Sequence, residues 1–424
     1  MNSAAEARQL LKDGRVLEAE RAYERVLAES PDNVEALNVV ALAALRGGRA
    51  ARALELLQRA AHSDPENAVT QHHLGRALEA CGESAAALTA HAAAVRKAPN
   101  FCLARMYLAG CLERRGLSEQ ALVQYKRALD DAQREGSWLN RETTPPPLRP
   151  LVEHAVSAVR RGGRALFARF LEPLQGRYGR ESLTRVEQSL RIFLNEEPPV
   201  YPDARQRPSF LFFPGLPPSA YLARALFPWI EAMETQTQAI VSELVELLPS
   251  PAGRERVFGT EELERENLRG MDVAPSWNGY YFFRHGERRN DNCESCPVTT
   301  ATLEATPLAR IREHAPEVLF SVFTAGTHLM PHRGVTNTRI VGHLPLIVPP
   351  DCALKVGGEI HEWRTGRVVM FDDTYEHEAW NRSSTTRVVL IFDVWNPHLT
   401  EAERAALADL IAAMGDFRRA VEQA

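Results

Sequence analysis

Two histidines and an arginine near the C-terminal end of the chain have residue types and spacing that suit a metal site. His332 lies in HLMPHRG and His377 in FDDTYEHEAW, each at the edge of a run rich in β-forming residues. Arg387 opens a strand-like run ten residues after the second histidine. Imidazoles bind iron, and a guanidinium pairs well with a carboxylate. This layout suits a jelly-roll metal site whose iron binds a dicarboxylate cosubstrate.

The residues around His332 match neither of two common metal-binding motifs. His328 and His332 are four residues apart, but a proline lies between them and no HExxH acid is present, which excludes a zinc-type helical pair. The usual triad of two histidines and one carboxylate would place an acid two residues after the first histidine, and this position is Gly334. Asp372 and Asp373 precede the second histidine and could ligate a metal, although a role in a turn is favoured.

Short β-strands must position these residues. After about residue 275, runs rich in Val, Ile, Leu and Phe alternate with turns that contain Gly and Pro, which predicts a sandwich or barrel. The runs cover residues 280–283, 318–323, 338–348, 353–356, 367–371 and 386–395. A closing amphipathic helix is expected from Thr400, which forms a capping box with Glu403.

A 34-residue repeat occupies the N-terminal third of the chain. It is marked by Gly14, Gly48, Gly82 and Gly116, by Ala19, Ala53, Ala87 and Ala121, and by Pro31, Pro65 and Pro99. This spacing resembles the tetratricopeptide repeat, in which the glycine ends a helix, the alanine permits close helix packing and the proline breaks the chain. About four repeats fit in residues 1–135, and their concave face is expected to bind a protein or peptide. The alternative is that the array only supports or dimerises the next domain.

A proline-rich segment marks the first domain boundary. TTPPPLRP, within residues 136–150, forbids a continuing helix. Helical patterns follow over about 151–195 and 217–248, and both are expected to be core or docking helices.

The cysteines favour structural roles over a metal site. Cys81, Cys102 and Cys111 fall in helical patterns and are expected to be small buried hydrophobic residues. Cys293 and Cys296 form a CxxC without a second pair of ligands, so a structural thiol pair or a disulfide in a loop is expected.

Length and composition predict a multidomain globular protein. The 424 residues are too many for one ordinary core, and 45% of them are hydrophobic. The net charge is −5 and the basic residues form no long block, so no nucleic-acid partner is expected. No apolar signal core and no run of about 18 apolar residues is present, so we expect a soluble, cytoplasmic protein without a membrane partner.

The C-terminal half closely resembles the aspartyl/asparaginyl β-hydroxylase family, whose architecture also has tetratricopeptide repeats before a jelly-roll oxygenase. The resemblance covers about residues 200–398 and rests on SVFTAGTHLMPHRGVTNTR, HLPLIVP, GRVVMFDDTYEHEAWN and FDVWNP. In that family two histidines alone hold the iron and glycine stands at the acid position, so Gly334 agrees with the pattern.

The resemblance implies a role for five residues. His332 and His377 match the iron ligands. Arg387 matches the arginine that pairs with the distal carboxylate of 2-oxoglutarate, and Ser321 matches its hydroxyl partner. His343 matches a histidine that helps to orient the other end of the cosubstrate.

One position departs from the family pattern. Better-known members carry an arginine two residues before the last of these histidines, where this chain has Val341. Arg339 is retained two residues earlier and is the candidate for binding a carboxylate of substrate or cosubstrate.

Together these arguments predict a multidomain α + β protein. An α-solenoid of repeats (1–135) would be followed by a Pro-rich linker and helical spacer (136–199), a double-stranded β-helix or jelly-roll domain (200–398) and a C-terminal helix (399–424). The resemblance implies an Fe(II)- and 2-oxoglutarate-dependent dioxygenase that hydroxylates an unactivated carbon, with the β-carbon of Asp or Asn in a recruited protein or peptide as the leading expectation. The alternatives are a non-catalytic scaffold with a vestigial jelly-roll, and a hydroxylase or halogenase of a small molecule.

Overall fold

The computed structural model describes residues 3–269 and 277–424, so the first two residues of the expected repeat array and residues 270–276 lie outside it. The chain divides into two compact units. One contains Met1–Leu166 and Phe417–Ala424, and the other contains Phe167–Asp416.

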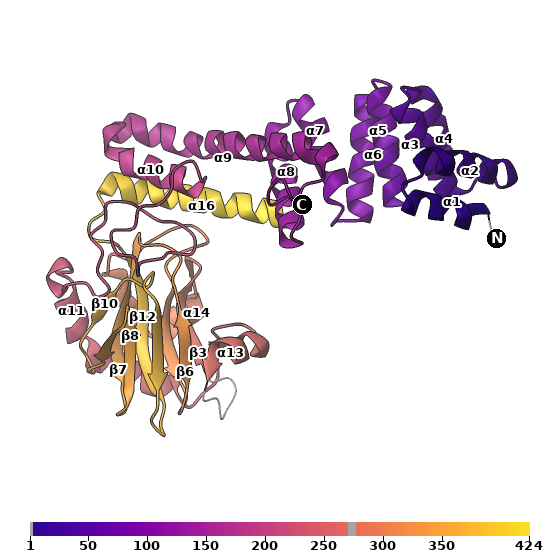
Figure 1. Cartoon of the computed structure of the whole chain (residues 1–424). Helices are drawn as coiled ribbons and strands as arrows, with labels where there is room; N and C mark the ends of the chain where they lie inside the picture. The colour runs from indigo at the N-terminus through magenta and orange to yellow at the C-terminus, as the bar shows by residue number, and fades with distance from the viewer. Residues whose placement is uncertain (1–2, 270–276) are drawn as a thin grey trace. The chain divides into compact units, whose positions relative to one another are not determined.

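Four helix pairs form the repeat array (Figure 1). They are α1 (Ser3–Lys12), α2 (Val16–Glu29), α3 (Val34–Arg46), α4 (Ala50–Ser63), α5 (Ala68–Ala80), α6 (Ser84–Lys97), α7 (Cys102–Arg114) and α8 (Ser118–Arg134). The glycine that follows the first helix of each pair has a positive φ, between 71° and 85°, as a left-handed helix end requires. The alanines that follow at the repeat spacing are buried against neighbouring helices. The predicted helical repeats are therefore confirmed.

Within the described residues, eight further α-helices follow the array. They are α9 (Arg149–Tyr178), α10 (Thr184–Phe193), α11 (Ile230–Thr235), α12 (Thr237–Leu247), α13 (Glu261–Asn267), α14 (Asn290–Ser295), α15 (Pro297–Glu304) and α16 (Glu401–Gln423). The pattern over 217–248 becomes α-helical only from residue 230, later than predicted. The capping box of α16 is present, because the Glu403 carboxylate accepts from the Thr400 backbone N–H at 2.9 Å and the Thr400 hydroxyl accepts from the Glu403 N–H at 3.2 Å.

Two antiparallel sheets form the β-rich part of the second unit (Figure 1). The first has the order β1-β3-β5-β12-β7-β10, with β4 paired to β3, and the second has the order β2-β6-β11-β8-β9. The strands are β1 (Arg254–Arg256), β2 (Leu268–Arg269), β3 (Trp277–Arg284), β4 (Glu287–Arg288), β5 (Val318–Phe323), β6 (His328–His332), β7 (Arg339–Ile347), β8 (Cys352–Val356), β9 (Glu359–Glu362), β10 (Val369–Phe371), β11 (His377–Asn381) and β12 (Arg387–Trp395).

Apolar side chains cover both faces of the first sheet. On one face, Phe320 and Leu390 pack with Ile230, Ile240 and other residues of α11, α12 and α15. On the other face, side chains of both sheets share a second cluster, which includes Phe323, Phe371, Val389, Leu354 and Val356. The two sheets therefore enclose a common interior, and the candidate active-site residues lie along it.

The six predicted strand runs correspond to β3, β5, β7, β8, β10 and β12. The strands that begin or end at the two candidate histidines, β6 and β11, were not predicted as strands. The sequences HLMPH and HEAWN have no clear alternation of polar and apolar residues, and the first contains a proline, which disfavours a strand assignment.

The structure agrees with a buried thiol pair at Cys293 and Cys296 and corrects the other cysteine predictions. All six cysteines are free thiols, so Cys293 and Cys296 form no disulfide. This pair lies at α14 and α15 in the main core and not in a loop, because the short helices bury both thiols against β3. Of the three cysteines in the repeats, only Cys111 is buried, while Cys81 is exposed beyond the end of α5.

Candidate active site between the two sheets

The structure brings His332 and His377 together on adjacent antiparallel strands. They are paired directly in the register of β6 with β11, and their ring centroids lie 4.0 Å apart. Directly opposed residues project to the same face of a sheet, which explains why two imidazoles far apart in the sequence meet here. This is the arrangement that two metal ligands on neighbouring strands require.

Backbone hydrogen bonds orient both rings in the same way. Nδ1 of His332 lies 2.9 Å from the Met330 carbonyl oxygen, and Nδ1 of His377 lies 3.1 Å from the Tyr375 carbonyl oxygen. A carbonyl can only accept, so each Nδ1 carries the hydrogen and donates it. In a neutral imidazole, Nε2 then keeps its lone pair for a metal.

Burial keeps both imidazoles neutral. Desolvation, reinforced by the neighbouring His332, lowers the pKa of His377 to about 3. Desolvation also lowers the pKa of His332. Metal binding needs the neutral imidazole, so both rings are in the required protonation state at neutral pH.

A carboxyl group from another loop fills the space next to Gly334. The Gly334 N–H donates to the Asp373 carbonyl oxygen at 2.7 Å, and a Cβ on Gly334 would lie 2.1 Å from the Asp373 carboxyl carbon. An acid at position 334 therefore has no room. Desolvation and the neighbouring Asp372 raise the pKa of Asp373 to about 8. Asp372 itself has the predicted turn role, because its carboxylate accepts from the backbone N–H and hydroxyl of Thr374 at 2.9 and 2.6 Å.

Arg387 is a buried cation without an acidic partner. Its side chain is 1% exposed and forms no ion pair with any acid of the described residues. The guanidinium carbon lies 4.2 Å from the ring centroid of Phe323 and 4.3 Å from that of Trp363. Its Nη1 donates to the hydroxyl and carbonyl oxygens of Ser321 at 3.3 and 3.4 Å, while Nε has no hydrogen-bond partner.

The buried position of Arg387 has an electrostatic cost. Desolvation lowers its pKa to about 9. An unpaired charge in a protein interior is strongly unfavourable, so the site is suited to an anion that would pair with the guanidinium. A carboxylate fits best, since a guanidinium can give it two parallel hydrogen bonds.

A chain of ring contacts connects the histidine pair to Arg387. His377 contacts Phe371 at 5.7 Å, and His343 contacts Phe371 at 4.9 Å and Trp363 at 5.8 Å between ring centroids. His343 is buried, and its Nδ1 has no hydrogen-bond partner. The structure therefore gathers the predicted histidines, arginine and serine along one interior surface.

Sequence reasoning missed two aromatic residues of this surface. Trp363 packs against the guanidinium of Arg387, and its buried Nε1 has no hydrogen-bond partner. The Trp277 indole N–H donates to the Ser321 hydroxyl at 2.9 Å. Neither tryptophan belongs to a motif that spacing could reveal, since each acts through a contact far away in the sequence.

Arg339 and His328 have other partners. Arg339 forms an ion pair with Asp393 at 2.5 Å and is paired with Trp395 in the strand register, whereas Arg387 lies at the opposite end of β12. Eight residues of strand separate these ends by roughly 26 Å. The structure therefore does not bring Arg339 to the pocket of Arg387. His328 pairs with Glu378 at 2.8 Å.

Comparisons with known proteins agree with this architecture. The family model for aspartyl/asparaginyl beta-hydroxylase matches residues 234–397, and a tetratricopeptide-repeat model matches residues 4–68. Mouse aspartate beta-hydroxylase domain-containing protein 2 is 31% identical over 252 residues, which cover 58% of this chain and 70% of the mouse protein. No helix of the described residues is both long and apolar enough to cross a membrane.

Two further relatives match shorter parts. Human aspartyl/asparaginyl beta-hydroxylase is 35% identical over 145 residues, which cover 34% of this chain but only 19% of the human protein. The ornithine lipid ester-linked acyl 2-hydroxylase of Rhizobium tropici is 32% identical over 176 residues, 41% of this chain and 59% of that protein. Both are named as hydroxylases. Because its C-terminal region matches these proteins, this chain belongs to the aspartyl/asparaginyl β-hydroxylase family and carries tetratricopeptide repeats at its N-terminal end.

Proposed function

We propose that the protein is an Fe(II)- and 2-oxoglutarate-dependent hydroxylase. The observation that carries the proposal is the combination of two neutral imidazoles with available Nε2 atoms and one buried guanidinium that has no acidic partner. Iron accepts imidazole ligands, and a keto-dicarboxylate would supply the missing anion. The two facing antiparallel sheets, with the site between them, support a double-stranded β-helix, and we retain the boundaries 136–199 for the spacer and 200–398 for this domain.

Each residue has a distinct task in this proposal. His332 and His377 would hold the iron through Nε2, and the carbonyls bonded to their Nδ1 atoms would keep the rings aligned. Arg387 and Ser321 would bind the distal carboxylate of 2-oxoglutarate. His343, between the two groups, would help to orient the cosubstrate.

The chain contributes binding, orientation and exclusion of water. When bound, iron together with 2-oxoglutarate and dioxygen supplies the oxidising chemistry that hydroxylates an unactivated carbon. The Phe323 and Trp363 rings that contact the Arg387 guanidinium would exclude water from its ion pair with the cosubstrate, which would strengthen that pair. Position 334 is a glycine and supplies no carboxylate of its own, so His332 and His377 would be the only protein ligands from β6 and β11.

Two classes of substrate are candidates for this hydroxylase. The repeat array favours a protein or peptide, with the β-carbon of Asp or Asn as the acceptor, because such arrays present a concave binding surface. The Rhizobium tropici relative is named for an acyl 2-hydroxylase of an ornithine lipid, which keeps a lipid substrate as the second candidate.

Succinate formation tests the activity. The full chain, incubated with ferrous iron, 2-oxoglutarate and dioxygen, should convert 2-oxoglutarate to succinate, and Asp- or Asn-containing peptides should gain the mass of one oxygen. The same assay with ornithine lipids distinguishes the second substrate. Normal iron binding and no succinate with any substrate would contradict the proposal and favour a scaffold. A matched control is the Arg387→Met variant, which should bind iron but form no succinate.

A further inference from the structure

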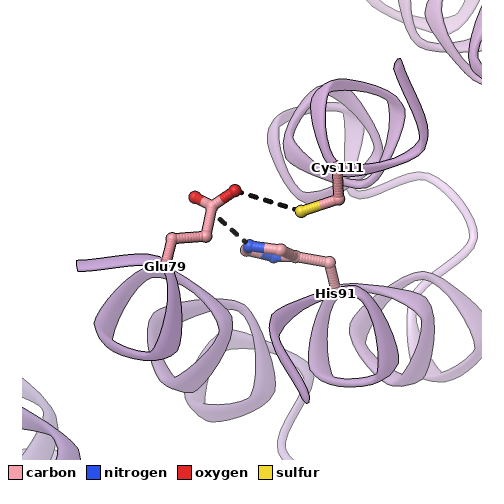
Figure 2. Close-up of side chains that lie close together, drawn as sticks. All are labelled: Glu79, His91 and Cys111. Carbon is pink, nitrogen blue, oxygen red and sulfur yellow. Dashed lines mark hydrogen bonds and ion pairs between the residues drawn. The ribbon is translucent and has the colours of Figure 1, made fainter. Parts of the chain in front are cut away.

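Three potential metal ligands converge inside the repeat array, away from the residues discussed above. Glu79 on α5, His91 on α6 and Cys111 on α7 point toward one another (Figure 2). One ligand atom from each lies within 4.8 Å of the other two. The His91 Nε2 lies 3.9 Å from the Glu79 Oε2, and the Cys111 thiol donates to the Glu79 Oε1 at 3.0 Å.

The repeat arithmetic makes these polar residues unexpected. Thirty-four residues earlier, the same three positions are Leu45, Leu57 and Ala77, which form an ordinary apolar contact between helices. His91 therefore replaces a core leucine. A buried polar group in such a place is unfavourable unless it has a partner.

A glycine on the neighbouring helix makes room for the His91 ring. Gly75 stands where the other repeats have alanine, and a Cβ there would lie 2.5 Å from the His91 ring. His91 is 0% exposed, and its Nε2 has no hydrogen-bond partner although it faces the Glu79 carboxylate. A side chain accommodated in this way, with one nitrogen left unsatisfied, indicates a missing ligand.

His72 orients the His91 ring. The two Nδ1 atoms lie 3.3 Å apart, so one ring donates to the other. A neutral His72 ring can accept through its Nδ1. When His91 donates from Nδ1, its Nε2 lone pair faces Glu79 and Cys111, and metal-binding histidines commonly donate their second nitrogen in this manner.

We infer that Glu79, His91 and Cys111 bind a zinc-class divalent cation that ties the third repeat to the fourth. Sulfur, imidazole nitrogen and carboxylate oxygen are the ligands that zinc prefers. Zinc bonds of about 2.0–2.3 Å in tetrahedral geometry place ligand atoms about 3.3–3.8 Å apart, so the observed cluster needs only small adjustments. A water molecule would complete the four ligands.

Metal binding exchanges partners within the cluster. The Cys111 thiol loses its proton to solvent as the sulfur–metal bond forms, so one proton is released for each ion bound and affinity rises with pH. Arg114, which is bonded to the Glu79 carboxylate and lies 3.3 Å from the Cys111 sulfur, must give up part of this contact. Its side chain is 59% exposed, so a move into solvent costs little.

Cobalt binding tests the site on the full chain. After chelator treatment, Co²⁺ added up to at least two equivalents, enough to fill the histidine pair as well, should produce a thiolate-to-cobalt charge-transfer absorption, which Zn²⁺ should remove by displacement. The histidine pair proposed to hold iron includes no cysteine and cannot give this signal, so the result is independent of the proposed hydroxylase activity. Absence of the absorption in the natural sequence would overturn the inference.

The preceding repeat supplies variants that are expected to fold. His91→Leu and Cys111→Ala introduce the residues found at the matching positions, Leu57 and Ala77, and each should abolish the absorption and the zinc-dependent rise in melting temperature. Cys102→Ala, on the same helix, is the matched control and should retain both. A cobalt–thiolate signal that survives Cys111→Ala, or that is lost in Cys102→Ala alone, would assign the ion to other residues and refute the site.

Discussion

Replacement of Arg387 by methionine should stabilise the β-rich unit and at the same time abolish binding of 2-oxoglutarate. Methionine keeps a long, flexible side chain between Phe323 and Trp363 but removes the buried charge. Most substitutions of buried residues destabilise a protein, so a gain in stability would be a distinctive result.

The structure gives the approximate size of the gain. A pKa lowered from 12.5 to about 9 corresponds to a cost of about 5 kcal/mol for the charged form. Two cation–π contacts offset about 1–2 kcal/mol each, and the long hydrogen bonds to Ser321 contribute little. The folded variant should therefore be more stable by about 1–3 kcal/mol, which raises the melting temperature by roughly 2–4 °C per kcal/mol for a unit of this size.

Calorimetry with and without 2-oxoglutarate measures both effects. The natural chain, loaded with a divalent metal, should melt at a higher temperature when 2-oxoglutarate is added, because a ligand of the folded state stabilises it. The Arg387→Met variant should melt higher without the ligand and show no further rise with it.

Arg339→Met is the matched control. This arginine pairs with Asp393, and the substitution leaves that mostly buried carboxylate with the Glu317 backbone N–H but without an ion-pair partner, so it should destabilise the unit by up to about 3–5 kcal/mol. It should leave the response to 2-oxoglutarate intact. A destabilised Arg387→Met variant, or one that still responds to 2-oxoglutarate, would refute the argument that Arg387 is a cation in need of an anion.

Three further predictions follow from the site and its surroundings. His377→Ala should lose stoichiometric iron, measured by elemental analysis, whereas His328→Ala on the paired strand should retain it. Gly334→Ala should destabilise the unit by about 1–3 kcal/mol in denaturant unfolding, because its Cβ would overlap the Asp373 carboxyl group. Desolvation raises the pKa of Glu317 to about 7 in the folded state. The folded state therefore holds the proton more tightly than the unfolded state, and the free energy of unfolding falls as pH rises from about 4.5 to 7. Glu317→Gln should therefore become progressively more stable than the natural chain over this pH range.

Controls for the last two predictions lie in the same unit. Gly176→Ala places a Cβ in open space on α9 and should be neutral or stabilising. Glu294→Gln makes the same change at an exposed acid and is the matched control for Glu317→Gln. An equal loss of stability in both glycine variants, or a parallel pH profile for Glu317→Gln and the natural chain, would contradict the respective prediction.

The repeat array was predictable because its signals are local. A glycine with a positive φ follows the first helix of each pair, and a buried alanine packs in the second helix. The 34-residue period of these two residue types therefore predicts the helix pairs directly. Six strands were predictable for the same reason, since each contains a run rich in Val, Ile, Leu or Phe. The strands β6 and β11 were not, because partners across the sheet, and not their own composition, hold them extended.

The sequence by itself determined the helical repeats, the β-rich C-terminal region and the residue types of the candidate site, because periodicity and motifs depend on neighbours in the chain. Only the tertiary structure decided which residues meet. The register of β6 with β11 places His332 opposite His377. In the other sheet, the register of β7 with β12 pairs Arg339 with Trp395, which leaves its side chain to pair with Asp393 and places it at the far end of β12 from Arg387. Likewise, three helices bring Glu79, His91 and Cys111 together, although no motif connects them. Contacts of this kind depend on packing between distant segments, which local patterns do not encode.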